Sequence, residues 1–180
     1  MNQYIKKVLI EEEAIYARCR ELGKVISQDY KAAQADPLLV GLLRGSIPFM
    51  AELIKHLELD AQYDFMDVTS YAGTMSTGDI KIIKDLDTSI EGLDILLVED
   101  IVDTGKTIES VKKLMYNKGA HSVKVVTLLD KPSRRIVNEK ADYIGFEIEN
   151  EFVVGFGMDF NQHYRCLPYV GVLKDELYQD

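Results

Sequence analysis

Apolar runs and amphipathic stretches alternate along this chain. Residues 11–33 repeat apolar positions at a helical spacing, which predicts one amphipathic helix. Residues 38–43 form a continuous apolar run, as a buried strand does, and a helix is predicted after it over residues 48–57. Residues 95–98 repeat this arrangement, with a helical pattern over residues 108–115. The chain is therefore built from βα units, which are the components of an open α/β sheet.

The remaining apolar runs predict further strands at residues 61–68, 80–86, 123–129 and 143–148, with a closing strand over residues 166–173. The polar stretch at residues 69–79 contains glycine and joins two of these strands, which predicts an antiparallel hairpin. Its composition fits a lid over a site as well as it fits the mobile tip of a hairpin. A length of 180 residues suits a single domain.

Residues whose side chains could bind a ligand or take part in catalysis gather where the run at residues 95–98 ends. Three carboxylates, Glu99, Asp100 and Asp103, follow this run within five residues. Like charges so close repel unless cations or hydroxyl donors offset them. The next four residues are Thr104, Gly105, Lys106 and Thr107. In an open α/β sheet, ligands bind at such strand-to-helix corners.

The start of the following helix favours an anion, because its first backbone N–H groups are unpaired and its dipole is positive there. Lys106 stands at the unfavourable end for a cation, and a bound phosphate would remove that conflict. The motif is not a P-loop, because a Walker A needs a glycine at the position of Asp100. A sugar phosphate satisfies the acids and the turn together, while the simpler alternative is an acidic, solvated turn capped by Thr104.

The segment from Val98 to Thr107, Val-Glu-Asp-Ile-Val-Asp-Thr-Gly-Lys-Thr, resembles the phosphoribosyl-pyrophosphate (PRPP) motif of type I phosphoribosyltransferases, especially their hypoxanthine-guanine branch. The similarity extends from about Leu39 to Arg165, with every motif in order. It implies an α/β fold with a mainly parallel sheet, helices on both faces and a small hood over the carboxyl ends of the strands. Residues 1–180 would form one domain, with a core over about residues 35–145 and a hood from the N-terminal segment and about residues 146–180.

The resemblance also implies roles for individual residues. For PRPP these are Glu99, Asp100, Asp103, Thr104, Gly105, Lys106 and Thr107, with Asp103 as the general base and Mg²⁺ held by Glu99, Asp100 and Asp159. Pyrophosphate would be bound by Arg44, Gly45 and Arg165, with a cis peptide at Leu43–Arg44, and Ser70 and Tyr71 would belong to a flexible lid. The purine would be bound by Lys131, Phe152, Val153 and Asp159.

The implied reaction transfers the 5-phosphoribosyl group of PRPP to hypoxanthine or guanine, giving IMP or GMP and pyrophosphate through an oxocarbenium-like transition state. Lys131 would select a 6-oxo purine, because an ammonium donates hydrogen bonds and cannot accept one from the amino group of adenine. Without the resemblance, Lys131 would be interpreted as a surface lysine and Phe152 as a core aromatic. The family also implies a homodimer or homotetramer.

Charge and composition narrow the alternatives. The net charge of −9 argues against nucleic-acid binding, and no apolar run is long enough to span a membrane. The first residues lack the apolar core of a signal peptide, so a cytoplasmic protein is expected. A xanthine-preferring enzyme of the same fold and a PRPP-sensing regulatory protein remain alternatives. Guanosine tetraphosphate, which carries a purine and a pyrophosphate, is a further candidate ligand.

Overall fold

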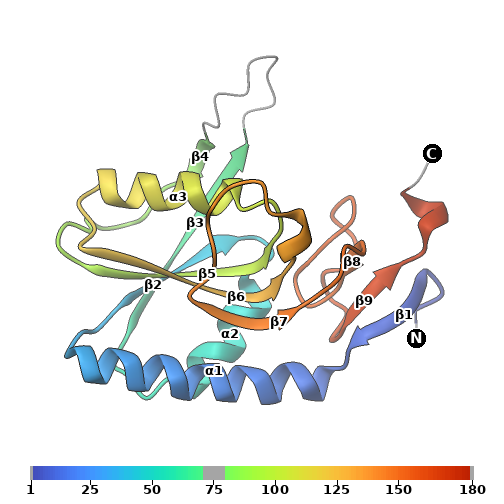
Figure 1. The fold of residues 1–180 in the computed structure, drawn as a ribbon, viewed down its shortest axis with the longest axis horizontal. Coiled ribbons are helices and arrows are strands. Elements are labelled where there is room, and N and C mark those ends of the chain that lie inside the picture. The colour runs from blue at the N-terminus through green and yellow to red at the C-terminus, as the bar shows by residue number, and fades with distance from the viewer. Residues whose placement is uncertain (1, 71–79, 179–180) are drawn as a thin grey trace.

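The computed structural model describes residues 2–70 and 80–178, which form a large sheet and a small one (Figure 1). The large sheet has six strands in the order β4-β3-β2-β5-β6-β7. Their bounds are β2 (Leu38–Leu43), β3 (Gln62–Ser70), β4 (Ile80–Lys84), β5 (Asp94–Val102), β6 (Ser122–Asp130) and β7 (Tyr143–Glu147). All neighbouring pairs are parallel except β3 and β4, so the expected mainly parallel sheet and the antiparallel hairpin are confirmed.

Helices cover both faces of this sheet, as expected (Figure 1). On one face α1 (Glu12–Ala33) and α2 (Ile47–Leu53), which continues as η1 (Ile54–His56), pack against alternate residues of β5 such as Leu96 and Val98. On the other face α3 (Lys106–Asn117) packs against the intervening residues, including Leu97. Because both faces of β5 are buried over residues 95–98, this part of the strand is a continuous apolar run rather than an alternating one.

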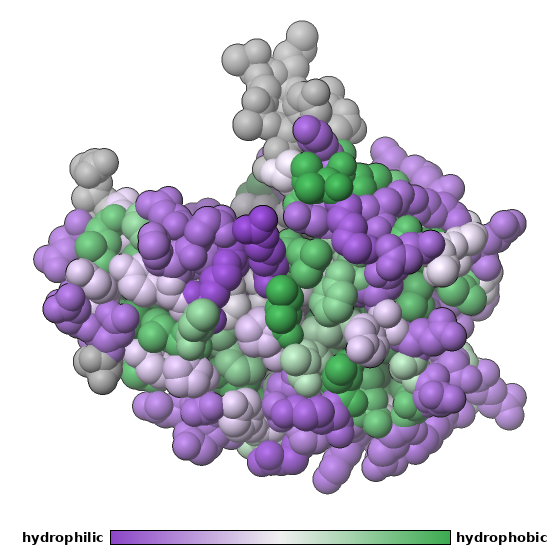
Figure 2. All heavy atoms as spheres, turned by 180° about the vertical axis from the view of Figure 1, so that it is seen from behind, coloured by the Kyte–Doolittle hydropathy of each residue, from purple (hydrophilic) through white to green (hydrophobic). Residues whose placement is uncertain are grey.

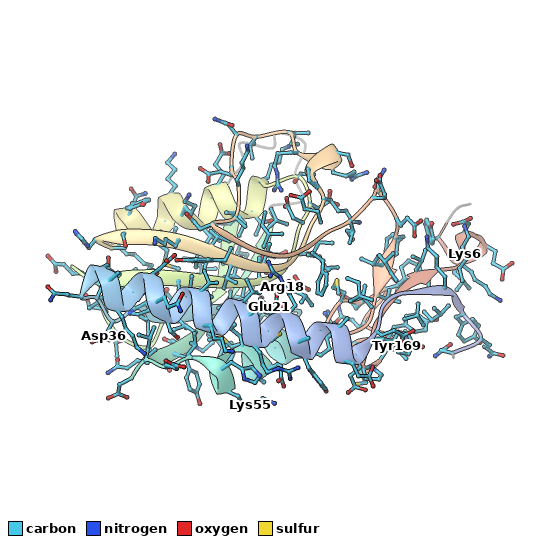
Figure 3. The ribbon with its side chains drawn as sticks, turned by 60° about the horizontal axis from the view of Figure 1, so that its bottom comes forward. Lys6, Arg18, Glu21, Asp36, Lys55 and Tyr169 are labelled. Carbon is cyan, nitrogen blue, oxygen red and sulfur yellow. The ribbon has the colours of Figure 1, made fainter. Side chains whose placement is uncertain are left out.

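Helix α1 is tied to the edge of the sheet by Arg18. The Arg18 guanidinium donates to the backbone carbonyls of Ile144 and Gly145 on β7, at 2.8 and 2.9 Å. The same guanidinium pairs with Glu21 at 2.7 Å, one turn further along the helix (Figure 3). A charged side chain of α1 therefore fixes this helix to β7, the strand at one edge of the large sheet.

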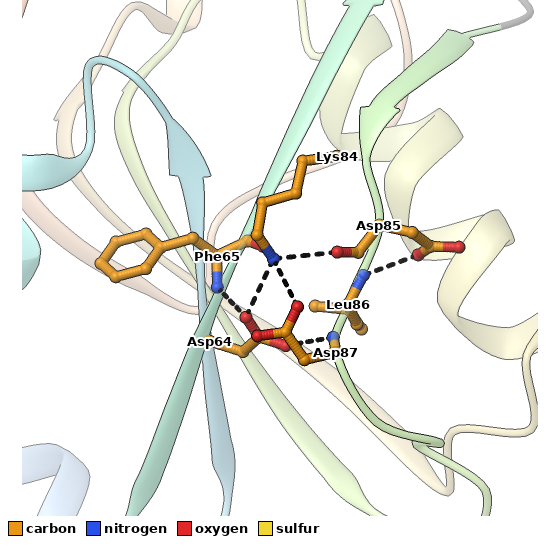
Figure 4. Close-up of polar contacts among 6 residues, drawn as sticks. All are labelled: Asp64, Phe65, Lys84, Asp85, Leu86 and Asp87. Atoms are coloured by element: carbon orange, nitrogen blue, oxygen red, sulfur yellow. Dashed lines mark hydrogen bonds and ion pairs between the residues drawn. The ribbon is translucent and has the colours of Figure 1, made fainter.

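The β3–β4 hairpin is held at its base by a polar cluster (Figure 4). The Lys84 ammonium pairs with Asp64 at 3.3 Å and with Asp87 at 3.1 Å. The backbone N–H of Asp87 donates to the second carboxylate oxygen of Asp64 at 2.8 Å. These contacts fix the two strands that carry residues 71–79, which lie outside the described part of the chain.

The small sheet joins both ends of the chain in the order β1-β9-β8, and its neighbouring strands are antiparallel. Its strands are β1 (Ile5–Ile10), β9 (Val170–Leu173) and β8 (Val153–Val154). We call this sheet, with residues 148–178 around it, the hood. The strand β1 was not predicted, because Lys6 and Lys7 interrupt its apolar residues. The predicted closing strand, residues 166–173, was too long: β9 begins only at Val170, and residues 166–169 form a turn and a bend that contain Pro168, which has no backbone N–H for a strand pairing.

Hydrophilic residues cover most of the face opposite to that of Figure 1, with apolar residues in small groups between them (Figure 2). Among residues 2–70 and 80–178, no helix combines the length and the apolar character needed to cross a membrane.

Candidate active site

The carboxyl ends of β5 and β6 bring two groups of predicted site residues together. The sequence analysis placed Glu99 and Asp100 in a corner after the strand. Strand β5 instead continues to Val102, so both residues lie within the strand. Val102 pairs with Asp130, and the backbone N–H of the next residue, Lys131, donates to the Val102 carbonyl at 3.0 Å. Asp103 and Lys131 therefore leave adjacent strands at the same level.

Glu99 and Asp100 form an acidic pair at this edge, in which Glu99 is buried and Asp100 is half-buried. Glu99 is only 8% exposed. Burial, and then the charge of Asp100, raise the pKa of Glu99 well above its usual value. Burial also raises the pKa of Asp100 from 3.8 to about 6; Arg165 opposes this rise and Asp159 adds to it. Two carboxylates held this way are short of positive charge, which a cation or the hydroxyls of a ligand would supply.

We predict that Asp100→Asn stabilises the fold at neutral pH. The folded-state pKa of Asp100 is raised, so its contribution to stability is complete below the unfolded value of 3.8 and is lost as the pH rises through about 6. At pH 7.5 the ionised group therefore opposes folding, and removing the charge should increase the free energy of unfolding by on the order of 1–3 kcal/mol. Urea unfolding of both proteins at pH 7.5 measures this gain.

The same comparison at low pH provides the internal control. The gain should shrink as the pH falls from 7.5 through 6, because wild-type Asp100 then becomes neutral as well. The exposed Asp60 offers a matched variant, and Asp60→Asn should leave the unfolding curve unchanged. A wild-type protein more stable than Asp100→Asn at pH 7.5 would contradict this account of the pair.

The turn after β2 lies directly against Asp100. A Cβ atom on Gly45 would lie 1.6 Å from Oδ2 of Asp100, so this position must be glycine unless the carboxylate or the turn moves. The peptide bond between Leu43 and Arg44 is cis, as the resemblance implied. From the hood, Gly157 approaches so closely that a Cβ on it would lie 1.9 Å from the Gly45 carbonyl oxygen. The hood and the core therefore meet at this turn.

Arg165 of the hood completes this part of the site. Its guanidinium donates to the Gly157 carbonyl at 2.7 Å and pairs with Asp159 at 2.8 Å. A cavity of about 240 Å³ is lined by Leu42, Leu43, Arg44, Gly45, Val68, Glu99, Asp100, Thr107, Asp159 and Arg165. The structure thus brings together the residues predicted for pyrophosphate and the acids predicted for magnesium, with two arginines and three carboxylates facing one space.

The predicted phosphate loop forms the start of α3. Gly105 has a φ of +84° and lies where a Cβ would be 2.8 Å from a methyl group of Val137, so it too must be glycine. The backbone N–H of Ile136 donates to the Thr104 carbonyl at 3.1 Å and holds the loop. A small hollow of about 80 Å³ is lined by Glu99, Ile101, Val102, Asp103, Thr104, Gly105, Thr107 and Ile108. Lys106 is exposed at the first position of α3 and does not line it.

A larger cavity of about 480 Å³ joins the strand ends to the hood. Its lining consists of Asp100, Ile101, Asp103, Lys131, Arg134, Asn150, Glu151, Phe152, Val153, Met158, Asp159 and Tyr178. It therefore contains all four residues predicted to bind the purine, together with Asp103. One wall is aromatic. Phe152 stacks on Tyr178 with 4.7 Å between the ring centroids, and it forms a T-shaped pair with Phe160 at a centroid distance of 5.6 Å.

Lys131 is held at the inner end of this cavity. Its side chain is buried, with 7% of the residue exposed, and its ammonium donates to the Glu151 carbonyl at 2.7 Å. Burial lowers the pKa of Lys131, while the charge of Asp103 raises it and that of Arg134 lowers it. A buried ammonium at the edge of a cavity is a strong donor for an oxygen atom of a ligand.

Several cavity residues were missed by the sequence analysis, among them Arg134 and Tyr178. Arg134 was not singled out, although it follows Lys131 by three positions. Tyr178 stands in the mostly polar stretch of residues 174–180, where its aromatic side chain was the only signal. Of the two predicted lid residues, Ser70 is the last residue of β3, and Tyr71 lies outside the described residues.

The acids could hold a cation together with a ligand. Within the described part of the chain, no group of three or more His, Cys, Asp and Glu side chains is placed to hold a metal ion. Magnesium is commonly held by one or two carboxylates, with waters and substrate phosphates completing its coordination. Asp100 and Asp159 line the same cavity, and Asp100 is a half-buried carboxylate with a raised pKa, so this pair fits that requirement.

Comparison with known proteins defines the class of this chain. The family model for the phosphoribosyl transferase domain matches residues 9–161, which include the large sheet, the helices and the acidic corner. The chain belongs to the phosphoribosyltransferase family.

Its relatives place it near one branch of that family. The hypoxanthine-guanine phosphoribosyltransferase of Lactococcus lactis is 54% identical over 179 residues, which cover 99% of this chain and 96% of that protein. A solved hypoxanthine phosphoribosyltransferase from Staphylococcus aureus is 48% identical with a TM-score of 0.92, covering 98% of this chain and 96% of that one. One from Trypanosoma cruzi is 35% identical with a TM-score of 0.94, covering 99% and 96%. The resemblance expected from the PRPP motif is confirmed.

Proposed function

We propose that this protein is a purine-salvage enzyme that transfers the 5-phosphoribosyl group of PRPP to hypoxanthine or guanine, producing IMP or GMP and pyrophosphate with Mg²⁺. The observation that carries the proposal is the single cavity in which Lys131, Phe152 and Asp103 face one another beside the phosphate loop. A purine stacked on Phe152 would offer its 6-oxo group to the Lys131 ammonium. The relatives at about 50% identity support the same substrates.

The bond changes in this reaction assign work to separate residues. The purine N9 forms a bond to C1′ of the ribose, and the C1′–oxygen bond breaks with its electron pair passing to pyrophosphate. Arg44, Gly45 and Arg165 would stabilise the charge on the departing pyrophosphate. Glu99 and Asp100 would accept hydrogen bonds from the ribose hydroxyls, and their charge would stabilise the oxocarbenium-like sugar. Thr104, Gly105 and Thr107 would hold the 5′-phosphate at the start of α3.

The proton on purine N7 must leave as the new bond forms. Asp103 is our candidate for its acceptor, because this residue lines both the purine cavity and the phosphate hollow. Magnesium held by Asp100 and Asp159, with Glu99 nearby, would offset the negative charge of PRPP and pyrophosphate.

We also propose that the lid with Ser70 and Tyr71 excludes water from the reaction. We further propose that the protein is a cytoplasmic homo-oligomer and that it needs no nucleic acid.

Base selectivity tests the proposal. We expect kcat/KM for hypoxanthine and guanine to exceed that for adenine by about 10³-fold or more, because the Lys131 ammonium cannot accept a hydrogen bond from a 6-amino group. Lys131→Gln should lower kcat/KM for hypoxanthine by about 10²-fold and narrow the gap to adenine, because an amide both donates and accepts. Steady-state rates of pyrophosphate release with hypoxanthine, guanine, adenine and xanthine measure both effects.

Lys140→Gln is a matched control, since Lys140 is exposed and does not line the cavities described above. Adenine used as well as hypoxanthine would refute the role of Lys131. A strong preference for xanthine would support the xanthine enzyme of the same fold instead. A protein that binds PRPP but turns over none of the four bases would support the regulatory alternative.

A further inference from the structure

Two consecutive arginines follow Lys131, and they have different surroundings. Arg135 is largely buried, where it pairs with Asp130 of β6 and packs against Gly105. Arg134, at the end of the short helix η2 (Pro132–Arg134), is 47% exposed in its side chain and lines the purine cavity. Arg135 is therefore part of the structural support beneath the phosphate loop, whereas Arg134 faces the site.

Arg134 contacts the candidate proton acceptor directly. Its Nε donates to Oδ1 of Asp103 at 3.0 Å, across 31 residues of sequence. The two groups reach each other because Asp103 follows β5, Lys131 follows β6, and the N–H of Arg134 donates to the Lys131 carbonyl at 3.1 Å. The turn thus aims Arg134 back toward the end of β5.

This ion pair contributes little to the stability of the fold. Its side chains are 47% and 39% exposed, and pairs so open to water are worth about 0–1 kcal/mol. Its charges act instead on the cavity, since both Asp103 and Arg134 influence the pKa of Lys131, the residue that faces the purine oxygen.

We propose that Arg134 is a positioning residue that orients Asp103 for proton transfer. The inference rests on the proposed function. With Oδ1 held by the guanidinium, Oδ2 is presented to the cavity as the atom that receives the N7 proton. Arg134 itself neither takes nor gives a proton, and acts only through Asp103.

The test compares kcat and KM for Arg134→Gln and Arg134→Lys in the pyrophosphate-release assay with PRPP, magnesium and hypoxanthine. Misdirecting a general base slows the chemical step more than it weakens binding. We expect Arg134→Gln to lower kcat about tenfold. The KM values for PRPP and for hypoxanthine should each change less than about threefold. Arg134→Lys keeps the charge without the planar Nε donor and should give an intermediate kcat. Thermal unfolding should be nearly unchanged in both.

A double-mutant cycle separates positioning from any other role. In an Asp103→Asn background, Arg134→Gln should have no further effect on kcat, because the group it orients is already lost. Arg20→Gln, on the exposed side of α1, is the control for loss of a surface arginine.

Three outcomes would overturn the inference. A kcat for Arg134→Gln within twofold of wild type would do so, as would an equal fall in both backgrounds. A wild type that turns over neither hypoxanthine nor guanine would remove the proposed function and this inference together. Turnover by wild type with an unaffected Arg134→Gln would remove the inference alone.

Discussion

Asp103→Ala should lower kcat for hypoxanthine by about 10²–10⁴-fold, the usual cost of losing a general base. Asp103 stands one residue beyond the end of β5 and opens onto both the purine cavity and the phosphate hollow. It is thus well placed to take a proton from the purine while the ribose of PRPP is held through its 5′-phosphate. Stopped assays of pyrophosphate release, with both substrates saturating, measure the effect.

Binding must survive for this result to be informative. Asp103 is partly exposed and pairs with the half-exposed Arg134, so its removal should leave the fold and PRPP affinity nearly intact. Isothermal titration of PRPP with magnesium checks this. A variant that binds PRPP and retains more than a tenth of wild-type kcat would show that another group, or water, accepts the proton.

Gly45→Ala should lower kcat/KM for PRPP by about 10²-fold. The new methyl would lie 1.6 Å from Oδ2 of Asp100 and 2.5 Å from its Cγ, so either the carboxylate or the turn must move. Either movement displaces a group expected to meet the ribose or the pyrophosphate. Displacements of about 1 Å in such groups cost about 10²-fold in rate. Initial rates at varied PRPP concentration test this prediction.

Gly92→Ala provides the contrasting control. Gly92 has a φ of +74°, but nothing lies within 4 Å of the position that its Cβ would occupy. This variant should therefore lose about 1–2 kcal/mol of stability through backbone strain while keeping its kinetic constants. If Gly45→Ala behaved like Gly92→Ala, the close approach to Asp100 would have no role in PRPP binding.

The core of the fold was predictable because its strands are buried on both sides. Residues 38–43 and 95–98 form continuous apolar runs, which are typical of strands buried on both faces, and the polar residues after them mark the carboxyl edge of the sheet. The hood was harder to predict. Strand β1 carries Lys6 and Lys7, and the turns before β9 depend on positive φ at residues such as Asn161, which side-chain type does not reveal.

The site was predictable where its residues are consecutive and obscure where they meet across the fold. Residues 99–107 could be interpreted together because one corner contains them all. The pair between Asp103 and Arg134 depends on the register of two strands, and the contact between Gly45 and Gly157 joins segments more than 100 residues apart. Neither contact leaves a periodic or compositional signal. Lys131 and Phe152 could be assigned only through the resemblance to a family.

The pairing of β1 with β9 has a consequence for how the protein is made. The acidic corner belongs to the six-stranded sheet, in which each later strand pairs with one that precedes it in the sequence, whereas Ile10 must wait for Val170 before it can pair. Contacts so distant in sequence form slowly, because a long loop must close first. We thus expect the small sheet of the hood to be the last part of the described structure to assemble. We therefore expect a nascent chain to form the corner at residues 99–107 before the hood closes over the larger cavity.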